Sequence, residues 1–279
     1  MRSQSSAWVC QDSELDPAVM SEETCSTTVS SVTPDLDCCN ERMPPEAPTR
    51  PTSQIKTLII FDYDDTILPT SFLAKNGFRV DSAAPTGNIK RALDEYSRYV
   101  NRTLSEASKY GHVLIVTNAE TGWIQLTVEK FLPQSAATVH RFQHISARSI
   151  FEPTGIVSPI AWKESAFRLV VEEYIEALGV PKQSTSLAGR RRSKCQVISL
   201  GDSAHEREAV LKVCDEFKVL SKSLKFMERP DLDALKKQHE LINECLHDIV
   251  KTRTNLDLCI QPSSPTCSPE KVSKSKGNN

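Results

Sequence analysis

The chain has 279 residues, of which 39% are hydrophobic and 25% charged, a composition typical of a soluble globular protein. No apolar run approaches the length needed to span a bilayer, and no apolar stretch follows Arg2, so we expect neither a membrane span nor a secretory signal. Residues 1–53 contain nine acids and three bases, a net charge of −6, which leaves +4 on the remainder of a chain whose net charge is −2. This balance is compatible with phosphorylated substrates but falls far short of a nucleic-acid-binding surface.

The cysteines indicate a reducing compartment. There are nine, an odd number, and no two are spaced as a CxxC pair. We therefore expect free thiols in a cytoplasmic protein, with neither a disulfide framework nor a zinc site. A basic segment, RRRSK at residues 190–194, leaves a nuclear location open as a weaker alternative.

The composition divides the chain into three parts. Residues 1–53 are rich in Ser, Thr, Pro and acids, which predicts a disordered tail that ends in a Pro-rich linker at residues 43–53. Residues 54–256 form the predicted folded domain, of normal size for one domain. Residues 257–279 are predicted to form a second polar tail.

Within the folded part, predicted strands and helices alternate in chain order. The apolar patterns predict strands at residues 58–61, 112–117, near 139–145, at 195–200 and at 217–220. They predict helices at residues 88–109, at 122–131, from 159 to about 178, after 202, and at 231–250. Such alternation implies a parallel sheet with right-handed crossovers, that is, a three-layer, Rossmann-like α/β fold with helices on both faces.

The helix that begins at residue 159 has three agreeing boundary signals. Ser158 is a favoured N-cap residue, Pro159 suits the first helical position, and Gly179 stands just past the expected end. The residues expected on its buried face are Phe167, Val170, Val171, Tyr174 and Leu178.

Carboxylates gather at the end of the first predicted strand, which reads LIIFDYDDT. Asp62 and Asp64 stand two residues apart on the extended chain, so both are expected to point the same way, while Tyr63 points away. Ligands of open α/β sheets bind at the carboxyl ends of the strands. Two like charges held close together favour an intervening cation, and oxygen ligands of this kind suit Mg²⁺.

Three later positions supply complementary chemistry at a strand end or a helix start. Thr117 is a hydroxyl at the end of the second strand, and Lys163 lies in the first turn of the helix after Ser158. Gly201 and Asp202 follow the strand at residues 195–200. Each feature is common alone, but the order of acid, hydroxyl, lysine and late acid resembles the motif order of the haloacid dehalogenase (HAD) superfamily, over residues 55 to about 225.

This resemblance implies a Mg²⁺-dependent phosphatase. Asp62 would attack phosphorus to form an aspartyl-phosphate, and Asp64 would protonate the leaving oxygen and then activate water. Lys163 would neutralise the charge of the phosphoryl group as it develops in the transition state.

The same resemblance implies how phosphate and metal are held. Thr117 and the adjacent Asn118 would bind the phosphoryl oxygens, together with Lys163. The metal ligands would be Asp62, Asp64 through its backbone carbonyl, and Asp202.

One position departs from the superfamily pattern. The outer acid after Asp202 is more usually an aspartate, whereas here Glu206 and Glu208 both follow, and the sequence does not decide between them. His205 is read as polar surface.

The segments between motifs are short for this superfamily. Residues 67–111 and 119–157 each hold about one core helix plus connections, which is too little for a cap domain with its own core. The chain therefore resembles cap-poor members, whose open sites accept macromolecules such as phosphoproteins.

Two other functions share parts of this pattern. A non-catalytic module that binds phosphate or a phosphoprotein remains open, because the same side chains would bind phosphate without turnover. A phosphorelay receiver domain is disfavoured, because its acidic pair should precede the nucleophile strand, and residues 1–57 show no such strand.

Overall fold

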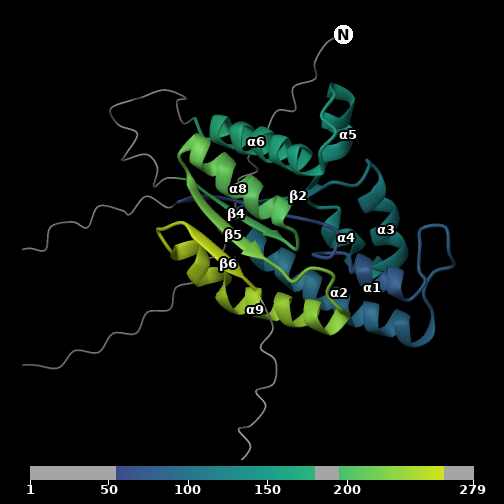
Figure 1. Ribbon diagram of the computed structural model, residues 1–279. Coiled ribbons are helices and arrows are strands. Elements are labelled where there is room, and N and C mark those ends of the chain that lie inside the picture. The colour runs from purple at the N-terminus through teal and green to yellow at the C-terminus, as the bar shows by residue number, and fades with distance from the viewer. Residues whose placement is uncertain (1–54, 180–194, 261–279) are drawn as a thin grey trace, which may run out of the picture. The chain divides into compact units, whose positions relative to one another are not determined.

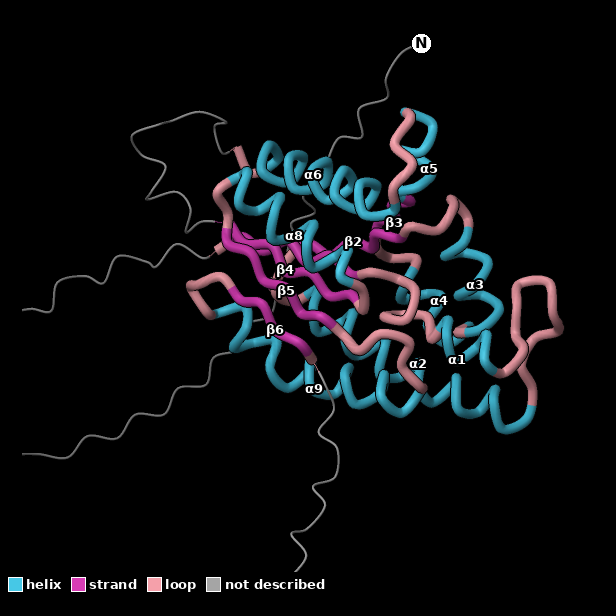
Figure 2. The backbone as a smooth tube through the Cα atoms, viewed as in Figure 1, coloured by secondary structure: helices cyan, strands magenta, loops and turns pink. Residues whose placement is uncertain are grey.

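A computed structural model describes residues 55–179 and 195–260. Its centre is a six-stranded parallel sheet (Figures 1 and 2) with the order β3-β2-β1-β4-β5-β6. The strands are β1 (Lys56–Phe61), β2 (His112–Thr117), β3 (Gln143–Ser146), β4 (Cys195–Gly201), β5 (Leu220–Lys225) and β6 (Leu256–Cys259). The predicted parallel α/β fold is confirmed.

Helices cover both faces of this sheet, as Figure 1 shows. They are α1 (Thr70–Lys75), α2 (Gly87–Ser108), α3 (Trp123–Phe131), α4 (Pro133–Val139), α5 (Ala147–Phe151), the 3-10 helix η1 (Glu152–Thr154), α6 (Pro159–Ala177), α8 (Ala204–Phe217) and α9 (Leu232–Lys251). Helices α6 and α8 pack on one face, and α1, α2, α3, α4 and α9 contribute to the core on the other.

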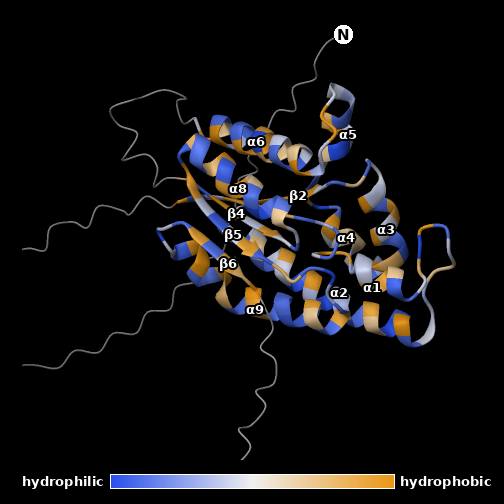
Figure 3. Ribbon diagram, viewed as in Figure 1, coloured by the Kyte–Doolittle hydropathy of each residue, from blue (hydrophilic) through white to orange (hydrophobic). Residues whose placement is uncertain are grey.

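The alternation of side chains along β1 explains its uninterrupted apolar sequence. Leu58 and Ile60 pack with α6 and α8, while Ile59 and Phe61 belong to the core beneath α2 and α9. Each of these four side chains is fully buried. A central strand covered on both faces has no solvent side, so it carries no polar alternation. Figure 3 shows that the surrounding helices, by contrast, carry both hydrophobic and hydrophilic residues along their length.

The order of the strands positions the site. The chain moves outward from β1 to β2 and β3, then returns to place β4 on the other side of β1. Phe61 of β1 lies in register between Ile115 of β2 and Leu200 of β4. The carboxyl ends of β1, β2 and β4 therefore meet where the strand order reverses, the place where ligands of open parallel sheets bind.

Helix α6 follows its predicted boundaries. It begins at Pro159 with Ser158 in the N-cap position, although the Ser158 side chain makes no capping hydrogen bond. It ends before Gly179, whose φ of +63° lies in the left-handed region that favours glycine. Phe167, Val170 and Val171 are buried as predicted.

Two predicted strands are misplaced. The strand expected near residues 139–145 begins only at Gln143, because Pro133 starts an additional helix, α4, that continues to Val139. The strand expected at residues 217–220 lies at Leu220–Lys225, since α8 continues to Phe217.

The strand β5 is buried although its sequence, LSKSLK, is largely polar. Lys222 is fully buried, and its ammonium donates to Gln196 Oε1 at 2.6 Å and to the Thr252 carbonyl at 2.7 Å, as well as to the Ile249 carbonyl. It thereby satisfies carbonyls at the C-terminal end of α9, which have no partner within the helix. This tertiary contact compensates for a polar residue in a central strand.

The predicted start of the second tail at residue 257 is wrong. Leu256–Cys259 form β6, which extends the sheet beside β5. The Ile260 backbone N–H donates to the Lys225 carbonyl at 2.7 Å, and the Ile260 side chain is buried. At four residues, the segment is too short for its strand character to be visible in the sequence.

Several predictions fall wholly or partly outside the described residues. These are the tail and linker at residues 1–53, the second tail beyond residue 260, and the basic segment at residues 190–194. Within the described ranges, no helix combines the length and apolarity required to cross a bilayer. The segments between β1 and β2 and between β2 and α6 fold into elements of the sheet layers, and no large cap domain is present in the described part of the chain.

Candidate active site

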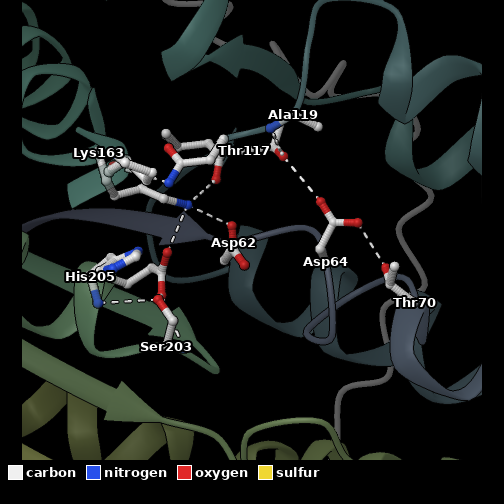
Figure 4. A network of polar contacts seen from close by, with 12 residues as sticks. Asp62, Asp64, Thr70, Thr117, Ala119, Lys163, Ser203 and His205 are labelled. Atoms are coloured by element: carbon white, nitrogen blue, oxygen red, sulfur yellow. Dashed lines mark hydrogen bonds and ion pairs between the residues drawn. The ribbon is translucent and has the colours of Figure 1, made fainter. Parts of the chain in front are cut away.

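Lys163 is the centre of the candidate site. It is the fifth residue of α6, is almost completely buried, and its ammonium nitrogen is 2.6 Å from Asp62 Oδ1 and 2.8 Å from Glu206 Oε1. The same nitrogen donates to the Val116 carbonyl at 3.0 Å. Figure 4 shows Lys163 reaching from the helix to the end of β1, where Asp62 stands. The structure thus brings together two of the predicted residues, Asp62 and Lys163.

Of the two acids between which the sequence did not decide, Glu206 is the one that faces Lys163. Ser203 caps α8, and the Ser203 backbone N–H donates to Glu206 Oε2 at 3.1 Å in a reciprocal capping box. This leaves Oε1 to face Lys163. Glu208, by contrast, is exposed.

Gly201 allows Glu206 to occupy this position. A Cβ atom at residue 201 would lie 2.6 Å from Glu206 Cγ, closer than real contacts allow. A glycine is therefore required at the end of β4, because any larger residue would collide with the Glu206 side chain that packs against the strand.

Asp202 completes a group of three acids. One carboxylate oxygen from each of Asp62, Asp202 and Glu206 lies within 4.8 Å of the others. Burial, with the negative charges of Glu206 and Asp65, raises the pKa of Asp202 to about 7. The cluster therefore holds more negative charge than Lys163 alone neutralises.

The charges of the Asp62, Lys163 and Glu206 group are coupled. Burial raises the pKa of Asp62 well above its usual value, although Lys163 opposes this effect. Burial alone would raise the pKa of Glu206 too, but the Lys163 ammonium and the hydrogen bonds from Lys163 and Ser203 lower it. The two carboxylates in turn raise the pKa of Lys163 despite its burial, so the lysine stays charged. Removing any one member would change the ionisation of the others.

Asp64 lies at the same edge but has different partners. Thr70 Oγ1 donates to its Oδ1 at 2.7 Å, the Trp123 indole N–H donates to Oδ1 at 3.0 Å, and Thr117 Oγ1 donates to Oδ2 at 3.2 Å. Figure 4 shows Asp64 turned toward Thr70 and Thr117, on the side away from Lys163. Its charge still raises the pKa of Asp62. The three acids that lie within 4.8 Å of one another do not include Asp64.

Sequence reasoning did not identify Thr70 and Trp123. Each is the first residue of the helix that follows a strand of the site, α1 after β1 and α3 after β2, and this placement near the carboxyl edge was the available signal. A tryptophan N–H usually finds a partner when partly buried, which made Trp123 the stronger of the two candidates.

The turn after β1 fixes the acidic residues. Asp65 has φ of +51°, in the left-handed region, and its carboxylate accepts from the Ser71 backbone N–H at 2.7 Å. Tyr63 points into the core, where its hydroxyl lies 2.8 Å from Thr127 Oγ1. The predicted opposite orientation of Tyr63 is therefore seen in the structure.

Thr117 and Asn118 lie at the end of β2. Thr117 accepts from the Ala119 backbone N–H at 3.0 Å while donating to Asp64. The Asn118 side-chain amide donates to the Pro159 carbonyl at 3.1 Å, which joins this loop to the start of α6. Thr117 therefore faces the acids, whereas the amide N–H of Asn118 is used in a structural contact.

The donor set fits a divalent cation. Both oxygens of Glu206 are engaged, Oε1 by Lys163 and Oε2 by Ser203, so Asp62 and Asp202 are the better ligands. Mg²⁺ characteristically uses one or two carboxylates and completes its shell with water and phosphate oxygens. Burial, with the neighbouring negative charges, raises the pKa of Asp202, and a bound cation would neutralise those charges.

Comparison with known proteins gives one similarity. No protein-family model matches the sequence, and no curated protein matches it either. Among solved structures, the chain is similar to a crystal structure of a HAD family hydrolase from Deinococcus radiodurans R1, determined with bound phosphate and sodium. The two chains are 13% identical, the match covers 74% of this chain and 92% of that chain, and the TM-score is 0.32. An overlap of this extent does not identify the activity, which has to be inferred from the side chains.

Proposed function

We propose that the chain is a Mg²⁺-dependent phosphohydrolase that cleaves phosphate monoesters through an aspartyl-phosphate at Asp62. The observation that carries this proposal is the buried Lys163 ammonium, held between Asp62 and Glu206 with Asp202 close by. Burying charged groups costs free energy, and such clusters at a ligand-binding edge are characteristic of functional sites.

Asp62 is the proposed nucleophile. Because Lys163 holds Oδ1, we assign the attack on phosphorus to Oδ2. The new O–P bond forms as the ester O–P bond breaks, and Lys163 stabilises the negative charge that develops. Thr117, which donates to Asp64 at the same edge of the sheet, is assigned to a phosphoryl oxygen.

Asp64 is the proposed acid and base. In its protonated form it gives a proton to the departing alcohol oxygen. It then takes a proton from the water that attacks the aspartyl-phosphate, which releases inorganic phosphate and restores the Asp62 carboxylate. To act in this way, Asp64 has to exchange one of its contacts with Thr70, Thr117 or Trp123 for the leaving oxygen.

Asp62, Asp202 and the backbone carbonyl of Asp64 are the proposed metal ligands. Bound Mg²⁺ would neutralise phosphate charge and orient the phosphoryl group. Lys163 and Glu206 remain outside this set, paired with each other.

Phosphorylated proteins are the proposed substrate class. Supporting this, the described part of the chain contains no large cap domain over the carboxyl edge of the sheet. A cytoplasmic location, with the nucleus as alternative, stays a prediction.

The test is hydrolysis of 4-nitrophenyl phosphate with Mg²⁺ and with EDTA. Wild type should be active only with the metal, and Asp62→Asn should lose roughly 1,000-fold or more in kcat, because an amide is no nucleophile. The exposed residue Glu208 supplies a control, since Glu208→Gln should retain activity. If wild type fails to hydrolyse any ester but inorganic phosphate raises its melting temperature, the non-catalytic binding module is the better description.

A further inference from the structure

A largely apolar pocket lies beside Asp64. Its volume is about 450 Å³, and it is lined by α1, the segment that follows α1, and parts of α3. The apolar lining side chains are Leu68, Leu73, Ala74, Phe78, Val80, Trp123 and Phe131. Nothing in the roles assigned above uses this pocket.

The pocket shares two residues with the surroundings of Asp64. Thr70 and Trp123 both line it, and both donate hydrogen bonds to Asp64 Oδ1. Thr117, assigned to the phosphoryl group, donates instead to Oδ2. Asp64 therefore stands between the phosphoryl side of the site and the pocket.

We infer that the pocket receives the aromatic ring of an aryl phosphate monoester, an inference that rests on the proposed function. The acid that protonates a leaving oxygen must touch that oxygen, so the organic group bonded to it must lie on the acid's side. On that side of Asp64 lie Thr70 and Trp123, which form part of the pocket wall. The ring of the leaving alcohol thus enters the pocket while its phosphate remains at Asp62.

The walls favour an aromatic group over a polar one. Phe78, Trp123 and Phe131 offer ring faces and edges for stacking. Arg79 and Asp81 line the pocket too, but their side chains are mostly exposed and pair with each other at 3.2 Å. A sugar or glycerol group would lose hydrogen bonds to water on entering such an apolar space.

One wall of the pocket is held in place by Lys130. Its ammonium donates to the Val80 carbonyl at 2.6 Å and also to the Ser82 carbonyl, across from α3 to the segment after α1. A wall held in this way forms a pocket before the ligand arrives, as small-molecule sites commonly do.

The inference predicts a preference among four substrates. Wild type should show a higher kcat/KM for 1-naphthyl phosphate than for glycerol 3-phosphate, and for a phosphotyrosine peptide than for the matching phosphoserine peptide. The naphthyl ester and the phosphotyrosine peptide share the aryl phosphate group. Comparing kcat/KM for these two substrates shows whether the enzyme prefers a small aryl ester or a phosphotyrosine side chain. Equal or reversed preferences in both pairs would overturn the inference.

Two pocket variants localise this preference. Val80→Asn should lower the ratio of kcat/KM for 1-naphthyl phosphate to that for glycerol 3-phosphate by about threefold to tenfold, since it makes an apolar wall polar. Ala74→Phe, which fills space at the pocket, should lower the same ratio. The matched control is Val157→Asn, because Val157 is 80% exposed and does not line the pocket. A ratio that neither pocket variant changes, or that Val157→Asn changes equally, would overturn the inference.

Binding of 1-naphthol, followed by its own fluorescence, separates this inference from the proposed function. Val80→Asn should raise the dissociation constant by a factor similar to its effect on the ratio. If esters are hydrolysed but 1-naphthol binds equally to wild type and Val80→Asn, the pocket inference fails alone. If 1-naphthol binds in the pocket but no ester is hydrolysed, the proposed function fails, and the leaving-group role fails with it.

Discussion

Lys163 carries the positive charge that makes the candidate site possible. It is buried, and its ammonium contacts the buried carboxylates of Asp62 and Glu206. A buried ion pair is a weak source of net stability, but removal of one partner leaves the other charges uncompensated. We therefore expect Lys163 to serve both the proposed activity and the stability of the fold.

Replacing Lys163 should reveal this coupling. Lys163→Met should lower the free energy of unfolding by about 3–5 kcal/mol, because it leaves two buried carboxylates without their cation. The double variant Lys163→Met, Glu206→Gln should recover part of that loss. Urea denaturation measures both, and a single variant as stable as wild type would contradict the assigned geometry.

The candidate site could be predicted from the sequence only where a strand end or a helix start defines position. Asp62 and Asp202 follow apolar strands, Thr117 ends one, and Lys163 follows a Ser-Pro helix start, so the parallel fold brings them to one edge. Thr70 and Trp123 reach Asp64 through the packing of α1 and α3 against the sheet. That packing depends on many distant contacts, which no local pattern contains.

At the scale of elements, α9 is tied to the loop that carries the acids. His239 of α9 is fully buried, and its Nε2 lies 3.0 Å from the Thr66 carbonyl, which can only accept, so Nε2 carries the proton. Nδ1 lies 3.0 Å from Thr103 Oγ1 and accepts from it. Both ring nitrogens are satisfied in the neutral form, and burial lowers the pKa of His239 to about 4.

This histidine should make the fold sensitive to acid. Between pH 6.5, the ordinary pKa of histidine, and a pH of about 4, the His239 side chain is protonated in the unfolded chain but neutral in the folded protein. The free energy of unfolding therefore falls as the pH falls through this range. The full difference corresponds to about 3 kcal/mol. His239→Gln should lose less stability than wild type between pH 7 and pH 5 in urea titrations. Equal losses would show that His239 is not buried in its neutral form.

Sequence patterns predict the central strands of the sheet better than the strands β5 and β6. The strands β1, β2 and β4 are apolar because both of their faces are covered, and all three were predicted. The strand β5 is largely polar in sequence and is buried through specific contacts such as that of Lys222 with α9, whereas β6 has only four residues and is mostly exposed. Their boundaries were accordingly misplaced or missed.

At the scale of the whole molecule, the proposed metal would join two strands. Asp62 follows β1 and Asp202 follows β4, the neighbouring strands at the point where the strand order reverses. A cation bound by both carboxylates stabilises the folded state, because the unfolded chain does not hold the two acids together.

Thermal unfolding should therefore respond to Mg²⁺. At pH 8, above the pKa of about 7 for Asp202, Mg²⁺ should raise the melting temperature of wild type and raise that of Asp202→Asn much less. Without metal, Asp202→Asn should be at least as stable as wild type, because the substitution removes a buried like charge. A Mg²⁺ response that survives Asp202→Asn unchanged would place the metal elsewhere.

The most direct measurement of the central claim is to trap the aspartyl-phosphate. Borohydride reduces an acyl phosphate to an alcohol, so enzyme quenched during turnover of an aryl phosphate and then digested should yield a peptide in which residue 62 has been converted from aspartate to homoserine. The conversion should require both substrate and Mg²⁺, and no such peptide should form from Asp62→Asn. Turnover without any reduced residue 62, or with reduction at another aspartate such as Asp64, would contradict the assignment of Asp62 as the nucleophile.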